Sequence, residues 1–190
     1  RVFQCWLFTT YFKEATTVYE FGCGSGINLA ALATLYPDKR YVGLDWSEAS
    51  IRIVDDMAQL RGWNMEGRIF DLFAPDESVE IDKGSIVLTR GALEQTGRDY
   101  EAFLQYILDE SPALCVNIEP ILEWYDDTNL GDYFAIRHHK KRKYLEGFLN
   151  RLNELQEAGR VEIIKTKRVC LGSRFTEGYS QVIWKPVPGG

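Results

Sequence analysis

Three glycines at alternate positions, preceded by an acidic residue, form the strongest chemical signal in this sequence. Glu20 is followed by Gly22, Gly24 and Gly26. An apolar, strand-forming stretch leads into the glycines and a run of helix formers at 29–33 follows them, which predicts a strand, a tight turn and a helix. Glycine allows the sharp turn and lets a ligand approach atoms that a Cβ would cover. The first turn of the helix would point free N–H groups at that ligand.

The residues around this turn distinguish two classes of cofactor. A dinucleotide site has the pattern G-x-G-x-x-G, with the pyrophosphate at the helix N-terminus. Here the third glycine comes one residue early, and Ile27 occupies the place of the last glycine. The carboxylate of Glu20 would repel a pyrophosphate, whereas it would attract a ligand with a cationic amino group. A nicotinamide oxidoreductase is therefore the weaker interpretation.

Two further acidic residues follow predicted strands at the spacing of a doubly wound sheet. Residues 40–45 are predicted to form a second strand ending in Asp45. This residue lies about twenty positions after the last glycine, where such folds place a carboxylate on ribose hydroxyls. Residues 67–73 are predicted to form a third strand, with Asp71 near its end. Because parallel strands line a ligand crevice with their carboxyl ends, we expect these acids to lie at one sheet edge.

Together these residues resemble the class I S-adenosylmethionine-dependent methyltransferases. The family's motif I, an acidic residue, any residue and then G-x-G-x-G, matches Glu20 and the three glycines completely. The resemblance implies S-adenosylmethionine as cofactor, S-adenosylhomocysteine as product, and Asp71 as acceptor from the adenine amine. We expect Trp46 to cover the adenine. The residues predicted to bind the cofactor are Glu20, Gly22, Cys23, Gly24, Gly26, Asn28, Asp45, Trp46, Asp71, Leu72, Thr89 and Arg90.

The whole chain, residues 1–190, is predicted to form a single α/β domain. The resemblance implies a Rossmann-like, doubly wound, mostly parallel sheet of seven strands with helices on both faces. Its implied strand order is 3-2-1-4-5-7-6, with the last strand antiparallel. Residues 1–15 are interpreted as the remnant of an N-terminal helix. The remaining strands are expected at 85–89, 113–118, 161–171 and 179–185.

Helix signals are clear in two further places. Ser47 is expected to cap a helix that runs to about Arg61 and stops at Gly62, and residues 100–110 form an amphipathic pattern. The inward residues of the helix that begins after Ser47 are expected to be Ile51, Val54, Met57, Ala58 and Leu60.

An apolar stripe at 145–155 predicts one helix from about residue 134 to Gly159. Projecting the stripe backwards by seven residues places His138 on the inward face, and the amino end of the helix would bring His138 and Arg142 to the cleft. Where many relatives carry a histidine after the fourth strand, this chain has Glu94 and Gln95. The candidate general bases are His138, Glu94 and His139, in that order, and the candidate substrate-binding residues are Gln95, Glu119, Tyr125 and Arg142.

The basic run at 138–143 is either a solvated helix face or a site for an anion. The second interpretation, with an acidic and aromatic loop facing the run, predicts a small polar, anionic acceptor such as a metabolite, sugar or glycan intermediate, with O-methylation favoured. The Asn/Asp-Pro-Pro-aromatic signature of amino-directed nucleic-acid methyltransferases is absent, and a net charge of −6 disfavours a polyanionic partner. The alternative is a non-catalytic domain of a larger protein that binds S-adenosylmethionine or S-adenosylhomocysteine.

Composition limits the remaining possibilities. With 45% hydrophobic residues the chain can bury one substantial core, and no apolar run approaches membrane-spanning length. Its four cysteines are far apart without a C-x-x-C pair, which indicates reduced, mostly buried thiols and a cytoplasmic setting. No metal site is predicted, because the acids at Glu119, Asp126 and Asp127 lack a diagnostic spacing.

Overall fold

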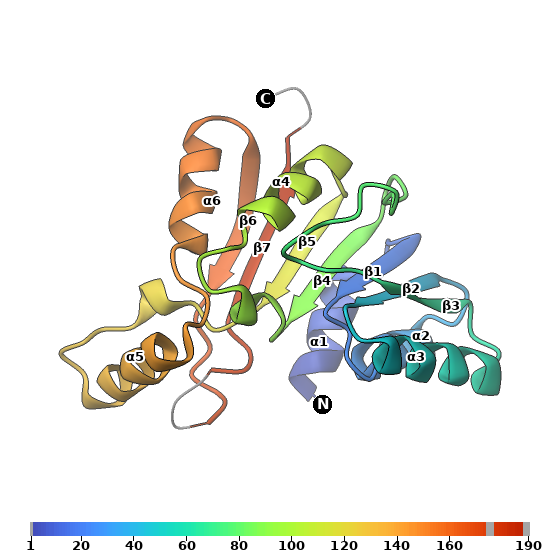
Figure 1. Ribbon diagram of the computed structural model, residues 1–190, viewed down its shortest axis with the longest axis horizontal. Coiled ribbons are helices and arrows are strands. Elements are labelled where there is room, and N and C mark those ends of the chain that lie inside the picture. Colours follow the sequence, from blue (N-terminus) through green and yellow to red (C-terminus); the bar gives the residue numbers. More distant parts are fainter. Residues whose placement is uncertain (1, 174–176, 188–190) are drawn as a thin grey trace.

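A computed structural model describes residues 2–173 and 177–187 of the chain (Figure 1). Helices and strands alternate along most of the sequence, as a doubly wound fold requires. In order, the elements are α1 (Val2–Tyr11), β1 (Thr17–Phe21), α2 (Ile27–Leu35), β2 (Arg40–Asp45), α3 (Glu48–Arg61), β3 (Met65–Ile69), β4 (Ile86–Arg90), the 3₁₀ turn η1 (Leu93–Thr96), α4 (Glu101–Glu110), β5 (Leu114–Ile118), the 3₁₀ turn η2 (Leu122–Trp124), α5 (Leu130–Arg142), α6 (Phe148–Glu157), β6 (Val161–Lys167) and β7 (Gln181–Pro186).

The strands form one seven-stranded sheet in the order β3-β2-β1-β4-β5-β7-β6. Neighbouring strands from β3 to β5 pair in parallel, whereas β7 runs antiparallel to both β5 and β6. The predicted fold class and strand order, with the last strand antiparallel, are therefore confirmed. The carboxyl ends of β1, β2, β4 and β5 consequently meet at one edge of the sheet.

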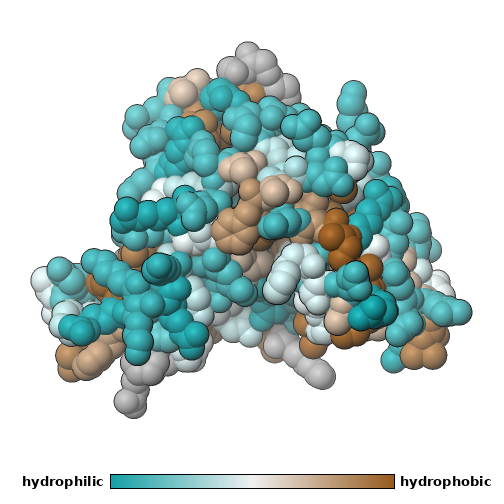
Figure 2. Space-filling view, viewed as in Figure 1, coloured by the Kyte–Doolittle hydropathy of each residue, from teal (hydrophilic) through white to brown (hydrophobic). Residues whose placement is uncertain are grey.

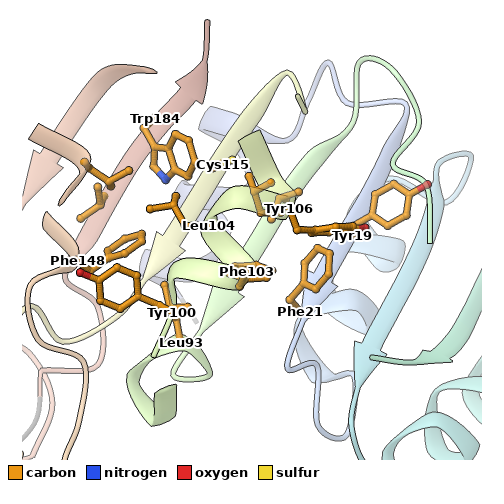
Figure 3. Close-up of a cluster of buried hydrophobic side chains, with 14 of the residues drawn as sticks. Tyr19, Phe21, Leu93, Tyr100, Phe103, Leu104, Tyr106, Cys115, Phe148 and Trp184 are labelled. Atoms are coloured by element: carbon orange, nitrogen blue, oxygen red, sulfur yellow. The ribbon is translucent and has the colours of Figure 1, made fainter. Parts of the chain in front are cut away.

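Both faces of the sheet are buried, because helices cover each of them. Successive side chains of a strand point to opposite faces and so enter different clusters. Val18 belongs to a cluster beneath α1, α2 and α3, whereas Tyr19 and Phe21 belong to the cluster beneath α4 and α6. Figure 3 shows Phe21 facing Phe103 of α4, and the two ring centroids lie 5.0 Å apart. This packing fixes the carboxyl end of β1, from which the glycine turn starts.

The helix after β2 largely follows its prediction. It begins after Ser47 and ends before Gly62, whose φ of 65° gives the expected left-handed C-cap. The Ser47 side chain, however, makes no capping hydrogen bond. Leu60 is 81% exposed, so its predicted inward position is wrong. It lies two residues, or about 200° of helical rotation, from the buried Ala58.

The single helix expected from 134 to 159 is wrong, because the chain breaks it into α5 and α6. The break contains Lys143 and Gly147, both with positive φ. Figure 1 shows α6 lying along the sheet, while α5 projects beyond the sheet's lower left end. A stripe projected across this break loses its register, which puts the predicted inward position of His138 in error.

Several element boundaries also differ from their predictions. The third strand, β3, ends two residues before Asp71, and β6 is shorter than the predicted strand at 161–171. The helix expected within residues 1–15 is present as α1, with residue 1 outside the described part of the chain.

All four cysteines are free thiols. Cys23 and Cys115 are buried, but Cys5 and Cys170 are exposed, so the expectation of mostly buried thiols is correct for only two of them. In the described ranges, no helix has the length and apolar character needed to cross a membrane.

Candidate active site

The glycine turn after β1 opens directly onto a cavity. Gly22 and Gly24 have φ values of 68° and 53°, which side chains other than glycine rarely adopt. A Cβ on Gly22 would lie 2.2 Å from the Cβ of Ala92, so the turn packs tightly against the segment after β4. A Cβ on Gly24 would meet nothing within 4 Å, because this residue faces the cavity. The two glycines therefore have different tasks, close packing and ligand access.

Glu20 lies behind the turn and is 1% exposed. Asn28 donates a hydrogen bond of 2.6 Å to one carboxylate oxygen, and the other oxygen has no hydrogen-bond partner among the described residues. Burial raises the pKa of Glu20 to about 8. A cation placed beside this carboxyl would favour its ionised form.

Asn28 connects this acid to two other parts of the chain. Its side-chain oxygen accepts hydrogen bonds from Arg90 at 2.7 Å and from Gln4 of α1 at 2.8 Å. Arg90 also lies over the ring of Tyr179 at 5.2 Å. The network thus brings a basic group from the end of β4 next to the acid at the end of β1.

Asp45 holds the glycine turn in place. Its carboxylate accepts hydrogen bonds from the backbone N–H groups of Gly24 and Ser47, both at 2.9 Å. This acid at the end of β2 is therefore tied to the end of β1 across the strand boundary. Each oxygen can accept a further hydrogen bond, and Asp45 lines the same cavity.

The cavity beside the glycine turn has a volume of about 440 Å³. Trp46, which is 79% exposed, lies at its rim, and the exposed Asp71 accepts a hydrogen bond from the Phe73 backbone N–H at 2.9 Å. We call this space the cofactor cavity; its lining is Gly22, Gly24, Asp45, Trp46, Phe70, Asp71, Leu72, Phe73, Gly91, Ala92, Gln95 and Thr96.

Six of the predicted cofactor residues line this cavity and six do not. The latter include Thr89, which is fully buried and accepts a hydrogen bond from Asn117 at 2.9 Å. Those in the lining are Gly22, Gly24, Asp45, Trp46, Asp71 and Leu72, and those outside the lining are Glu20, Cys23, Gly26, Asn28, Thr89 and Arg90.

Glu119, at the end of β5, determines the conformation of the opposite wall. Its fully buried carboxylate accepts hydrogen bonds from the backbone N–H groups of Ala92, Leu93 and Glu94, at 3.3, 3.2 and 3.1 Å. These donors lie at the start of η1, which supplies part of the cavity lining. Burial raises the pKa of Glu119 to about 7. Glu119 thus contacts the protein's own backbone around the site.

Two adjacent residues of η1, Glu94 and Gln95, carry polar side chains beside the cofactor cavity. Burial raises the pKa of the half-buried Glu94 to about 7, a value suited to a group that exchanges protons at neutral pH. Gln95 is exposed and lines the cofactor cavity. This wall is the region where the sequence predicted the acceptor.

A second, larger hollow of about 760 Å³ adjoins the cofactor cavity and shares Phe73, Gln95 and Thr96 with it. Figure 2 shows mainly hydrophilic side chains over the lower left region, where Figure 1 places α5. We call this space the basic cavity; its lining is Phe73, Gln95, Thr96, Gly97, Arg98, Asp99, Leu122, Lys140, Arg142, Lys143, Tyr144 and Glu146.

The predicted inward position of His138 is wrong, because the next residue occupies it. His139 is fully buried, with its ring centroid 5.3 Å from that of Tyr125 and 5.5 Å from that of Tyr144, whereas His138 is half-buried. Neither histidine is among the described residues that line the two cavities. Arg142, by contrast, lines the basic cavity.

Tyr125 packs in an ionic cluster that fastens α5 to the sheet. Arg168, just after β6, forms a two-point contact with Asp132 of α5 at 2.5 and 2.8 Å and donates to Glu177 at 2.8 Å. Its guanidinium also lies 4.8 Å from the ring centroid of Tyr125 and donates to the Trp124 carbonyl at 2.9 Å. This cluster determines where the basic end of α5 lies.

Several lining residues were not predicted as functional. Phe70, Ala92 and Thr96 show no motif, and only the tertiary fold brings them to the cofactor cavity. Lys140 and Lys143 lie within the basic run, so its charge was the signal that could have identified them. Among the described residues, no group of three or more histidine, cysteine, aspartate or glutamate side chains could hold a metal ion.

The strand order and the glycine turn after Glu20 are those of the Rossmann-like fold found in class I S-adenosylmethionine-dependent methyltransferases. Residues 18–109, slightly less than half of the chain, match the family model described as a methyltransferase domain. The resemblance and the expected cofactor are thereby confirmed. No curated protein gives a significant sequence match to this chain.

Solved structures share the fold at low sequence identity. The mitomycin 7-O-methyltransferase MmcR superposes with a TM-score of 0.71 at 15% identity, covering 98% of this chain and 53% of its own. The O-methyltransferase NcsB1 from neocarzinostatin biosynthesis was solved with S-adenosylmethionine and 2-hydroxy-5-methyl naphthoic acid. It superposes with a TM-score of 0.63 at 17% sequence identity, and the match covers 90% of this chain and 49% of NcsB1. The small RNA methyltransferase HEN1 superposes with a TM-score of 0.67 at 18% sequence identity, and the match covers 100% of this chain and 25% of HEN1. The chain thus spans about half the length of the first two, and the fold is shared by enzymes with different acceptors.

Proposed function

We propose that this protein transfers the methyl group of S-adenosylmethionine to an oxygen of a small polar, anionic acceptor. The observation that carries the proposal is the junction of two cavities at Gln95 and Thr96. One cavity is bounded by the glycine turn and the strand-end acids, and the other by basic side chains. An acceptor in the basic cavity would meet the cofactor at this junction.

The protein's part in the reaction is alignment and removal of a proton. When bound, S-adenosylmethionine supplies a methyl group activated by its sulfonium. The acceptor oxygen forms a bond to the methyl carbon as the carbon–sulfur bond breaks, which leaves S-adenosylhomocysteine. The wall formed by η1 and Phe73 would orient the acceptor and exclude water. A base takes the hydroxyl proton of the acceptor.

Glu94 is our first candidate for this base. It lies on η1 next to Gln95, and a Cβ on Gly91, a cofactor-cavity residue, would lie 4.0 Å from its carboxylate. A base with a pKa of about 7 is half ionised at neutral pH. Glu94, His138 and His139 all lie outside both cavity linings, but the histidines pack beside Tyr144 of the basic cavity, whereas Glu94 adjoins Gly91 of the cofactor cavity; the histidines are therefore weaker candidates. Gln95 and Arg142 remain proposed acceptor contacts, whereas Glu119 and Tyr125 would act through the segments that they hold.

Calorimetric titration with S-adenosylmethionine and S-adenosylhomocysteine tests the cofactor site. We expect micromolar binding to the wild type and about a tenfold or greater loss in Asp45→Asn, which disturbs both the turn and the proposed ribose contact. Asp56→Asn is the matched control, because Asp56 is exposed on α3 and remote from the cavity lining. Failure of a folded wild type to bind either compound would overturn the proposal.

Transfer is then measured with a labelled methyl donor and a panel of hydroxylated acceptors. Methylated product that depends on Glu94, with Glu94→Gln lowering kcat, supports catalysis by this residue. Tight cofactor binding without product from any acceptor would instead favour the alternative of a non-catalytic binding domain. Methylation of RNA but not of small molecules would contradict the proposed acceptor class.

A further inference from the structure

The basic cavity has a charge balance that the cofactor does not explain. Four of its lining side chains are basic and two are acidic, which gives the lining a net charge of +2 although the whole chain carries −6. Arg98 pairs with Glu146 at 2.6 and 3.1 Å, so these two charges largely compensate each other. The remaining charges are those of Asp99 and of the basic end of α5, at Lys140, Arg142 and Lys143, so the net positive charge comes from α5.

Among the described residues these three side chains form no salt bridge or side-chain hydrogen bond. The hydrogen bond from Arg98 is the largest cause of the lowered pKa of Glu146, and Lys140 acts on Glu146 only through its charge, as a smaller cause. Basic residues at a helix C-terminus often serve its last carbonyl groups. Here that task is done by the backbone, since the Lys143 N–H donates to the carbonyls of His139 and Lys140 and the Tyr144 N–H donates to His139 at 3.0 Å. The charged ends of the three side chains remain available to a ligand in the cavity.

Their position is also fixed by the rest of the fold. Arg168 holds the first turn of α5 through Asp132. At the other end, the Leu145 N–H donates to the carbonyl of Glu94 at 2.8 Å and the Glu146 N–H donates to that of Gly97 at 3.1 Å. The segment after α5 is thus fastened to η1, so the basic side chains are held beside the junction of the two cavities.

We propose that the basic cavity binds a phosphate group of the acceptor, which deepens and rests on the proposed methyl transfer. A phosphate monoester carries a charge of about −1.5 to −2 at neutral pH and offers three acceptor oxygens, which matches three lysine and arginine donors and a net charge of +2. A single carboxylate would leave part of this charge uncompensated. The phosphate anchors the acceptor in the basic cavity, while its hydroxyl reaches the cofactor at Gln95 and Thr96.

The direct test is a titration with inorganic phosphate, pyrophosphate and acetate, followed by backbone amide signals in nuclear magnetic resonance spectra. We expect phosphate to bind in the millimolar range, pyrophosphate to bind more tightly and acetate to bind weakly, with shifts centred on Gly97 and Tyr144. The test variant is Lys140→Gln/Arg142→Gln/Lys143→Gln, in which phosphate affinity should fall about tenfold or more.

A control with the same change in charge is Arg137→Gln/Lys141→Gln/Lys167→Gln, whose three positions are exposed and outside both cavity linings. The control should bind phosphate within about twofold of the wild type, apart from a general charge effect removed by salt. Equal loss in the control and test variants, no phosphate binding by the wild type, or equally tight binding of acetate would overturn the proposal.

Titration of the same samples with S-adenosylhomocysteine separates the two claims. If the wild type binds S-adenosylhomocysteine but not phosphate, the acceptor class is wrong and the proposed methyl transfer stands. If it binds phosphate at the basic cavity but no S-adenosylhomocysteine, the proposed function fails, whereas the anion site is retained.

Discussion

The two sides of the site are built by different means. On the cofactor side, the chain positions its groups through neighbouring strands, the glycine turn and a short-range bond from Asp45 to Gly24. On the acceptor side, the segments 91–97 and 119–146 are irregular or project from the sheet. Their positions depend on bonds between distant residues, chiefly those of Glu119 and Arg168. Local patterns thus determine one side, and tertiary contacts determine the other.

The largest effect should come from the place where the two sides touch. Gly22→Ala would put a Cβ 2.2 Å from Ala92, in a residue whose φ is 68°. The strained backbone costs about 1 to 2 kcal/mol, and the overlap should cost about 1 to 3 kcal/mol more. We therefore expect a strong loss of stability in urea unfolding together with loss of cofactor binding.

Gly62→Ala provides the matched control for this substitution. Gly62 has a φ of 65°, but a Cβ there would meet nothing within 4 Å. It should therefore show only the cost of the backbone conformation, about 1 to 2 kcal/mol, and keep its cofactor affinity. Equal destabilisation by both substitutions would show that the contact between Gly22 and Ala92 has no energetic importance.

An intermediate effect is expected for Glu119→Gln. Glutamine has a single acceptor oxygen and presents an NH₂ group to backbone donors, so at least one of the three N–H groups loses its partner. We expect a loss of about 2 kcal/mol in the free energy of S-adenosylhomocysteine binding, which is about thirtyfold in affinity, because η1 forms part of the cavity wall.

Glu110→Gln is the control, since Glu110 accepts a hydrogen bond from the Ile81 backbone N–H at 2.6 Å but lies outside both cavity linings. It should change stability without changing cofactor affinity. If Glu119→Gln binds S-adenosylhomocysteine as tightly as the wild type, its carboxylate does not hold the cofactor wall.

The smallest effect is expected for Arg168→Lys, which affects the acceptor side alone. Lysine keeps the charge but cannot make the two-point contact with Asp132. The amides of α5 should therefore exchange faster with solvent, by about fivefold for a local loss of about 1 kcal/mol, while S-adenosylhomocysteine affinity stays unchanged.

Arg137→Lys, also on α5, serves as the control because the Arg137 side chain donates a hydrogen bond to Tyr133 of the same helix and lies over its ring. Its amide exchange should match that of the wild type. A drop in cofactor affinity caused by Arg168→Lys would show that the two sides are not positioned independently.

The same contrast explains how far the sequence was informative. β2 was predicted with its observed bounds, and the glycine turn with its acids was located correctly, because their signals are local. Lys143 adopts a positive φ without a glycine or proline to indicate the end of α5, so His138 was predicted at the place that His139 holds. The capping role of Glu119 depends on backbone groups 25 to 27 residues away, which no local pattern reveals.

We propose that Glu20 and the glycine turn bind the cationic end of the cofactor, and proton release on binding tests this role most directly. Because burial raises the pKa of free Glu20 to about 8, this carboxyl is mostly protonated at pH 7, and a cationic amino group beside it would ionise it. Calorimetry of S-adenosylhomocysteine binding in two buffers of different ionisation enthalpy should show release of close to one proton at pH 7, falling towards zero above about pH 9.

Glu20→Gln should abolish most of this release and weaken binding, whereas Glu94→Gln should leave the release at pH 7 largely unchanged. Binding of S-adenosylhomocysteine with the same proton release in the wild type and in Glu20→Gln would contradict the account, because the cationic group would then lie away from Glu20.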